Sequence, residues 1–155
     1  MHRALTFVAV VGMAAGIASA QSGVLMVPES SNDRVMLFDA FDGSLITDNF
    51  IDLVPQGAGT PINAVQAGQE IWVSDQIADS IFRYSLDGST HLGTITGGMD
   101  NIRGFEVVGN TAYVTNSGTG NGAPGDGIVT IDVSSATING FFASGDTGAG
   151  DPFDV

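Results

Sequence analysis

The sequence contains neither cysteine nor lysine. Without cysteine, disulfide bridges and thiolate metal sites are excluded, even in an oxidising compartment. Packing must therefore hold the folded state together. The chain has 155 residues, and a domain of this length is able to bury one hydrophobic core.

Positive charge is scarce. Seventeen acidic residues stand against four arginines, which gives a formal net charge of −13. A field of this sign repels the phosphates of nucleic acids and the anionic surface of a membrane. We therefore exclude nucleic acid as a partner and assign the acidity mainly to solubility.

A long hydrophobic run is found only in the first twenty residues. A short basic start, His2-Arg3, precedes an apolar stretch over 4–17, and Ala18-Ser19-Ala20 has the pattern of a cleavage site. This arrangement predicts a signal peptide over residues 1–20 and a mature chain that is secreted or periplasmic. A retained membrane anchor is the alternative. No stop-transfer segment follows, so we expect no membrane association after cleavage.

Short β-rich runs are abundant and recur as pairs around a polar loop, roughly every forty residues. Asp42-Gly43 and Asp87-Gly88 follow two of these pairs and are typical hairpin turns. Such regularity predicts an all-β repeat protein. The three pairs are 24–28 with 35–39, 71–75 with 81–85, and 112–116 with 128–132.

Several of these runs are apolar at consecutive positions, as in Val35-Met36-Leu37-Phe38. Strands of this kind lie in sheets that are covered on both faces, which favours stacked propeller blades over a β-sandwich. We place Trp72 and Tyr113 in the strand position of Leu25 and expect both to be core residues. The predicted fold is an incomplete β-propeller of about three four-stranded antiparallel blades. Its expected parts are residues 21–53 (a blade lacking its innermost strand), 61–96, 102–143, and 152–155 as the start of another blade.

Two segments carry a family resemblance. Ser31-Asn32-Asp33-Arg34-Val35-Met36-Leu37-Phe38-Asp39, with the turn that follows it, resembles the blade of NHL-type propellers. Ala112-Tyr113-Val114-Thr115-Asn116 resembles the related propellers named for their Tyr-Val-Thr-Asn strand. The likeness extends over about residues 24–155. It implies a propeller and leaves activity open, since such blades occur in binding modules and in enzymes.

Three blades are too few to close a ring of about four to eight, and open sheet edges invite association. One interpretation is that the chain is the front of a longer propeller, or the product of a truncated gene. The other is a homodimer in which residues 153–155 add the missing inner strand to a partner chain, closing a six-bladed ring. Edge-to-edge self-association is expected in either case.

Candidate binding residues follow from the propeller pattern. The connections at one end of the blades are long and acidic, and long loops on a rigid scaffold often bind ligands. The alternative is that these loops only absorb chain length and charge. Asp75 and Asn116 lie where two strands enter this end. Asn63 and Arg103 open inner strands and are candidates to face the central channel, although we favour a pairing of Arg103 with Asp100 or Glu106.

The sequence offers little catalytic chemistry. Beyond the expected signal peptide, His91 is the one histidine, and no serine lies in a Gly-x-Ser-x-Gly motif. We therefore expect a non-catalytic scaffold that binds a protein or a glycan, with no cofactor. The resemblance also implies an alternative, part of an enzyme of the streptogramin lyase or gluconolactonase type with a divalent metal. Only Glu29, Asp75 and Asn116 have side chains of a roughly suitable type for such a site, and the sequence shows no full set of metal ligands.

Overall fold

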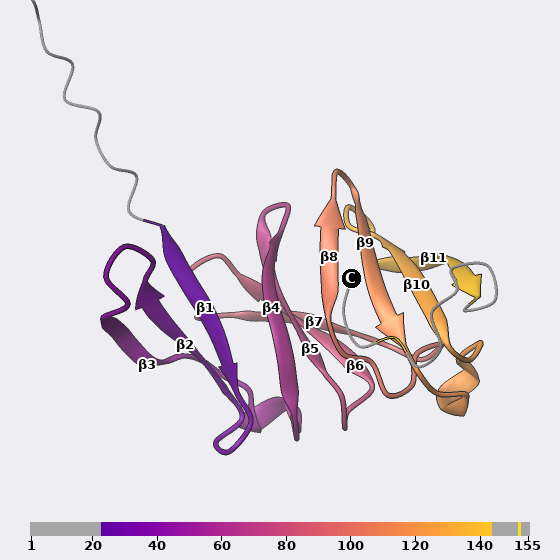
Figure 1. Cartoon of the computed structure of the whole chain (residues 1–155), viewed down its shortest axis with the longest axis horizontal. Coiled ribbons are helices and arrows are strands. Elements are labelled where there is room, and N and C mark those ends of the chain that lie inside the picture. The colour runs from indigo at the N-terminus through magenta and orange to yellow at the C-terminus, as the bar shows by residue number, and fades with distance from the viewer. Residues whose placement is uncertain (1–22, 144–151, 153–155) are drawn as a thin grey trace, which may run out of the picture.

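The computed structural model describes residues 23–143 and residue 152 (Figure 1). The expected signal peptide and residues 153–155 lie outside this range. Within it, strands and two short 3-10 helices are the regular elements, so the all-β prediction is confirmed. The strands are β1 (Val24–Glu29), β2 (Arg34–Asp39), β3 (Leu45–Asp52), β4 (Pro61–Ala67), β5 (Glu70–Asp75), β6 (Ser80–Ser85), β7 (His91–Thr96), β8 (Phe105–Val108), β9 (Thr111–Asn116), β10 (Gly127–Asp132) and β11 (Thr137–Ala143).

The strands form three antiparallel sheets in chain order. The first sheet is β1-β2-β3, the second is β4-β5-β6-β7, and the third is β8-β9-β10-β11. The first sheet has three strands, as the missing inner strand predicted, and the others have four. The sheets stand side by side, with β1, β4 and β8 along one side of the molecule (Figure 1). This arrangement is propeller-like, and the described sheets do not close into a ring.

Each sheet contains at least one tight hairpin between neighbouring strands, and the β6–β7 hairpin also contacts the first sheet. Gly88, in the β6–β7 turn, has a φ of +72°, which L side chains rarely adopt. A Cβ atom at this position would lie 2.7 Å from the backbone oxygen of Phe50 on β3. Glycine is therefore required both by the Asp-Gly turn and by the close approach of the first sheet.

Two hydrophobic core clusters lie between the sheets, one at each junction. The first joins Val35 of the first sheet to Val73 and Phe82 of the second. The second joins Trp72 and Ile81, on the opposite face of the second sheet, to residues of the third sheet such as Val114. The second sheet is thus covered on both faces, which explains its consecutive apolar residues.

Strand register corrects one prediction. Glu29 pairs with Arg34 at the end of β1, as Asp75 pairs with Ser80 at the end of β5. Counting back from these pairs, Met26 is the equivalent of Trp72, and the placement of Leu25 in that position is wrong by one residue.

The register also separates the two aromatic residues that were expected in the core. Trp72 is fully buried, as expected, because the third sheet covers it. Tyr113 occupies the same position on β9 but is only partly buried. Its side chain points away from the second sheet, and no further sheet is present among the described residues to cover it.

The first sheet has Met26 at the position that Trp72 occupies in the second sheet, and the smaller side chain leaves space between these two sheets. Between the first and second sheets lies an open apolar pocket of about 240 Å³, and Met26 lines it together with Leu37 and Ile71. The corresponding space between the second and third sheets is filled by Trp72. Among the described residues, no helix is long or apolar enough for a membrane crossing.

Candidate functional site

The long connections of the three sheets gather at one end of the molecule, here called the loop end. Strands β1, β5 and β9 run towards it, and the short hairpin turns lie at the opposite end (Figure 1). The sequence predicted this separation of long and short connections. The loop end consists of residues 30–33, 53–60, 76–79, 97–104 and 117–126.

Asp75 fixes two of these loops. Its side chain is fully buried, and one carboxylate oxygen accepts hydrogen bonds from the backbone N–H groups of Gly59 and Thr60, both at 2.9 Å. The other oxygen accepts from Ile77 at 3.0 Å and Ala78 at 2.8 Å. Four N–H donors satisfy the carboxylate, which compensates its burial. Asp75 therefore positions the loop end from beneath and is not exposed to a ligand.

Tyr84 anchors the neighbouring loop. This loop contains the 3-10 helix η1 (Val54–Gln56), and the buried Tyr84 hydroxyl donates to the Gln56 side-chain oxygen at 2.6 Å. Burial, followed by the negative charge of Asp52, raises the pKa of Tyr84 to about 12. The hydroxyl is therefore a stable donor over the whole physiological pH range.

The two anchored loops carry exposed aliphatic side chains. Val54 is 59% exposed and Ile77 is 70% exposed. The loops lie against each other, because a Cβ atom at Gly59 would be 3.1 Å from the Cβ of Ile77. Two of the exposed aliphatic side chains therefore lie on anchored loops of the loop end.

Asn116 occupies the position of Asp75 in the third sheet, and its side-chain amide likewise holds the backbone of nearby loops. Its Nδ2 donates to the backbone oxygens of Gly118 at 2.9 Å and Gly125 at 2.7 Å. Its Oδ1 accepts from the N–H of Asp100 at 2.8 Å. The side chain is buried and closes the long loop between β9 and β10.

A second set of polar contacts joins the loops of different sheets. Asp79 accepts hydrogen bonds from the N–H of Asn101 at 2.6 Å and from Nδ2 of Asn121 at 2.8 Å. All three residues have left-handed φ values between +50° and +53°. Aspartate and asparagine tolerate this region better than other non-glycine residues, and their short side chains bond locally. These contacts tie the second and third sheets together at the loop end.

Asn63 and Arg103 lie near each other at the junction of β4 and β8. Nδ2 of Asn63 donates to the backbone oxygen of Phe105 at 2.6 Å, and the Ser74 hydroxyl donates to the backbone oxygen of Arg103 at 2.7 Å. The Ser74 hydroxyl also accepts from the N–H of Asn63 at 3.2 Å. Asn63 thus helps to join the inner strands of two sheets, and Arg103 presents a partly buried side chain beside it.

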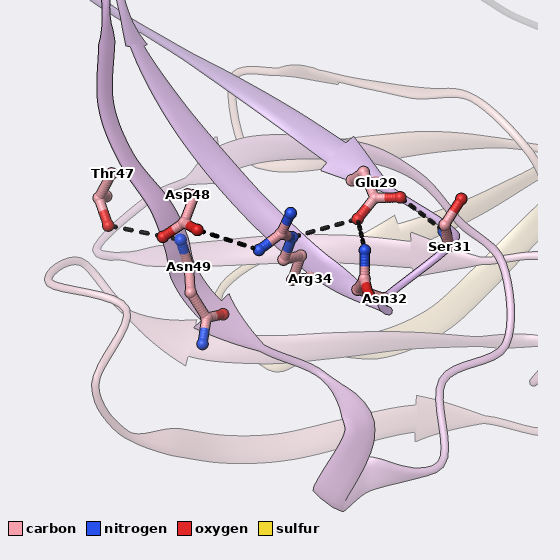
Figure 2. A network of polar contacts seen from close by, with 7 residues as sticks. All are labelled: Glu29, Ser31, Asn32, Arg34, Thr47, Asp48 and Asn49. Atoms are coloured by element: carbon pink, nitrogen blue, oxygen red, sulfur yellow. Dashed lines mark hydrogen bonds and ion pairs between the residues drawn. The ribbon is translucent and has the colours of Figure 1, made fainter.

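Glu29, the equivalent of Asp75 in the first sheet, forms part of an exposed network. Figure 2 shows Arg34 between Glu29 of β1 and Asp48 of β3. Arg34 Nε donates to Glu29 at 3.1 Å, and Asn32 Nδ2 donates to Glu29 at 2.8 Å. The Asn32 amide, with smaller contributions from Ser31 and Arg34, lowers the pKa of Glu29 to about 2. The carboxylate therefore stays ionised in moderately acidic solution.

Glu29, Asp75 and Asn116 take equivalent places on three neighbouring sheets, each at the end where its strand enters the loops. Each uses its side-chain oxygens to hold nearby backbone or side-chain donors. Within residues 23–143 and 152, no group of three histidine, aspartate or glutamate residues is arranged to hold a metal ion. His91 lies on the outer strand β7, with its ring centroid 5.3 Å from that of Tyr84.

Sequence reasoning missed Val54 and Ile77 as surface residues, and it missed the role of Asp79. The apolar run of β5 ends at Val73, and Ile77 stands as an isolated aliphatic residue in the loop that follows the strand, which was the one signal for it. Val54 precedes a proline and gave no comparable signal. Comparison with protein-family models gave no match, and comparison with curated proteins gave none either.

Proposed function

We propose that the chain is an exported, incomplete β-propeller of the NHL type and serves as a non-catalytic scaffold that binds a partner through its loop end. The three neighbouring antiparallel sheets and the recurring strand-end residues support the propeller. The apolar stretch and Ala-Ser-Ala pattern of the first twenty residues support export.

The observation that carries the binding proposal is the pair of exposed aliphatic residues on anchored loops. Val54 and Ile77 are more than half exposed, although the loops beneath them are fixed by Tyr84 and Asp75. A pre-organised surface loses little conformational entropy on binding. Aliphatic side chains surrounded by polar loops suit a protein partner better than a glycan, because the core of a protein interface is apolar and its rim is polar.

A photo-crosslinking experiment tests this proposal. A benzophenone amino acid replaces Ile77 in one variant and Phe41 in another, and both are produced in a cell that exports the chain. Phe41 is 93% exposed and lies in the β2–β3 turn at the opposite end, so it is a matched control. We expect a discrete crosslinked protein from position 77 and none from position 41. The same products from both positions, or none from position 77, would contradict a binding role for the loop end.

A glycan array separates the two classes of partner. Wild-type chain and the Ile77→Asp variant are applied to the same array at the same concentration. Binding of defined glycans by the wild type, lost in the variant, would assign the loop end to a glycan and overturn the preference for a protein.

A further inference from the structure

The outer face of the first sheet has the residue pattern of a face that is buried elsewhere in the molecule. Leu25 and Val27 are 51% and 40% exposed. Their equivalents on β5, Ile71 and Val73, are 4% and 0% exposed because the first sheet covers them. On β2, Met36 and Phe38 continue the outer face, paired with Val27 and Leu25. An exposed apolar sheet face of this kind is typical of a contact surface.

The outer face of the third sheet supplies the opposite half of the same contact. Tyr113 and Ile128 are only partly buried, whereas their equivalents on the second sheet, Trp72 and Ile81, are both 0% exposed beneath the third sheet. Phe142 on β11 is 49% exposed, and its ring is stacked on Tyr113 with 6.5 Å between the centroids. Around Tyr113, Ile128 and Phe142 this face is therefore apolar, and Glu106, the strand partner of Tyr113, is an exposed charged residue on the same face.

We propose that these two faces pack against each other between two copies of the chain, which together form a closed ring of six sheets. Inside the chain, both junctions between sheets bring the same two kinds of strand face together. A face of the Trp72 and Ile81 type meets a face of the Ile71 and Val73 type. Among the strands that the structure describes, one face of each type has no neighbouring sheet, so a third sheet on a partner's first sheet repeats a contact that the chain already makes twice.

The number of copies follows from ring closure. The described residues of one copy contribute three sheets, and β-propellers close with about four to eight blades. Two copies give six sheets, which falls within this range, whereas three copies would give nine, which falls outside it. Each junction joins two unlike faces, and a two-fold axis along the ring centre repeats that junction, so that the third sheet of each copy meets the first sheet of the other.

Charge influences the strength of the dimer without opposing its geometry. On the first sheet, the cation at the border of the apolar face is Arg34, which already pairs with Glu29 and Asp48. Leu25, Val27, Met36 and Phe38 carry no charge. On the third sheet the exposed Glu106, which pairs with Tyr113, is an anion that the contact has to leave at its edge in water. The copies as a whole carry −13 each, so added salt should strengthen the dimer by screening their repulsion.

Light scattering after size-exclusion chromatography tests the assembly on the purified full chain. We expect a single species of twice the chain mass for the wild type. Val27→Asp should shift this species to the mass of one chain. Phe41→Asp also replaces an apolar side chain by a carboxylate, but at an exposed turn, and should leave the dimer intact. A wild-type monomer, an open-ended series of larger species, or equal masses for both variants would overturn the proposal.

A disulfide experiment tests which faces meet, and the lack of native cysteine makes it clean. Val27→Cys and Ile128→Cys chains are mixed in equal amounts under mild oxidation. Their equivalents Val73 and Val35 share one core cluster, so the two cysteines should lie close across the joining contact. We expect a crosslinked dimer from the mixture and little from either variant alone or from a mixture with Gln69→Cys, an exposed turn position. Crosslinking that does not depend on the pairing would refute the assigned faces. Neither experiment involves the loop end, so failure here is separable from failure of the proposed binding role.

Discussion

Replacement of Asp75 by asparagine changes the loop end by a single functional group. The carboxylate accepts four backbone hydrogen bonds, two at each oxygen. An asparagine side chain offers one oxygen and one NH₂ group, so in either orientation two N–H donors face another donor. Those donors are either the N–H groups of Gly59 and Thr60 or those of Ile77 and Ala78.

The magnitude follows from the bonds that are lost. A hydrogen bond to a charged group contributes about 1.5–3 kcal/mol, and a buried donor left without an acceptor costs about as much. Two lost bonds should therefore lower the free energy of unfolding by at least about 3 kcal/mol. For a chain of this length, this corresponds to a fall in Tm of roughly 10 °C.

Urea and thermal unfolding followed by circular dichroism measure the effect, with all variants at one protein concentration because association raises apparent stability. Two matched variants complete the experiment. Asn116→Asp turns a carboxylate towards the backbone oxygens of Gly118 and Gly125 and should destabilise to a similar extent. Asp87→Asn makes the Asp75→Asn change in an exposed turn and should have a much smaller effect. A Tm for Asp75→Asn within error of the wild type would refute the structural role of this carboxylate.

Three further expectations follow from particular residues. Met26→Trp should fill the apolar pocket of about 240 Å³ between the first two sheets and raise the free energy of unfolding by about 1 kcal/mol, and a lower urea midpoint would show that the pocket does not admit an indole. The carboxyl of Glu29 should titrate near pH 2 by NMR, and since its pKa is lowered from 4.5 in the folded state, its contribution to stability is complete above about pH 4.5 and is lost as the pH falls towards 2. A midpoint near 4.5 would mean that the Asn32 and Arg34 contacts do not form in solution. The exported product should begin at Gln21 when its N-terminus is sequenced, and a product that begins at Met1 would contradict the signal peptide.

The strand pattern of the sequence was informative because each sheet repeats the same chemistry. Consecutive apolar residues in Val35-Met36-Leu37-Phe38 and in the strands around Trp72 indicated sheets with two contact faces, and the second sheet has both faces covered. The Asp-Gly turns marked where β2 and β6 end. Turn residues and side-chain periodicity can be recognised in the sequence itself, so the strands, the turns and the two contact faces of the sheets could be predicted.

The register of the first unit was harder to predict. Val24–Val27 is apolar at every position, so nothing in its periodicity distinguishes Leu25 from Met26 as the counterpart of Trp72. Only the pairing of Glu29 with Arg34 resolves the one-residue shift. The partial exposure of Tyr113 could not be predicted from its strand, because the burial of a side chain there depends on whether a neighbouring sheet covers it.

The candidate site depended still more on tertiary structure. Sequence position placed Asp75 and Asn116 where strands meet the loops, but it did not show that their side chains hold backbone groups and leave the surface to Val54 and Ile77. Contacts between loops from different sheets, such as that of Asp79 with Asn121, join residues 42 positions apart and leave no periodic signal.

The stacking of the second sheet against the third is tested most directly by NMR. Trp72 is the single tryptophan, so its indole resonances are unambiguous, and its Nε1–H donates to Glu70 at 2.8 Å. Nuclear Overhauser effects from the indole ring should reach methyl groups of the third sheet, such as Val114 and Val129, with which Trp72 shares a core cluster. Effects that connect the ring instead to Val35 of the first sheet, or to no methyl group of the third, would contradict the arrangement of stacked sheets.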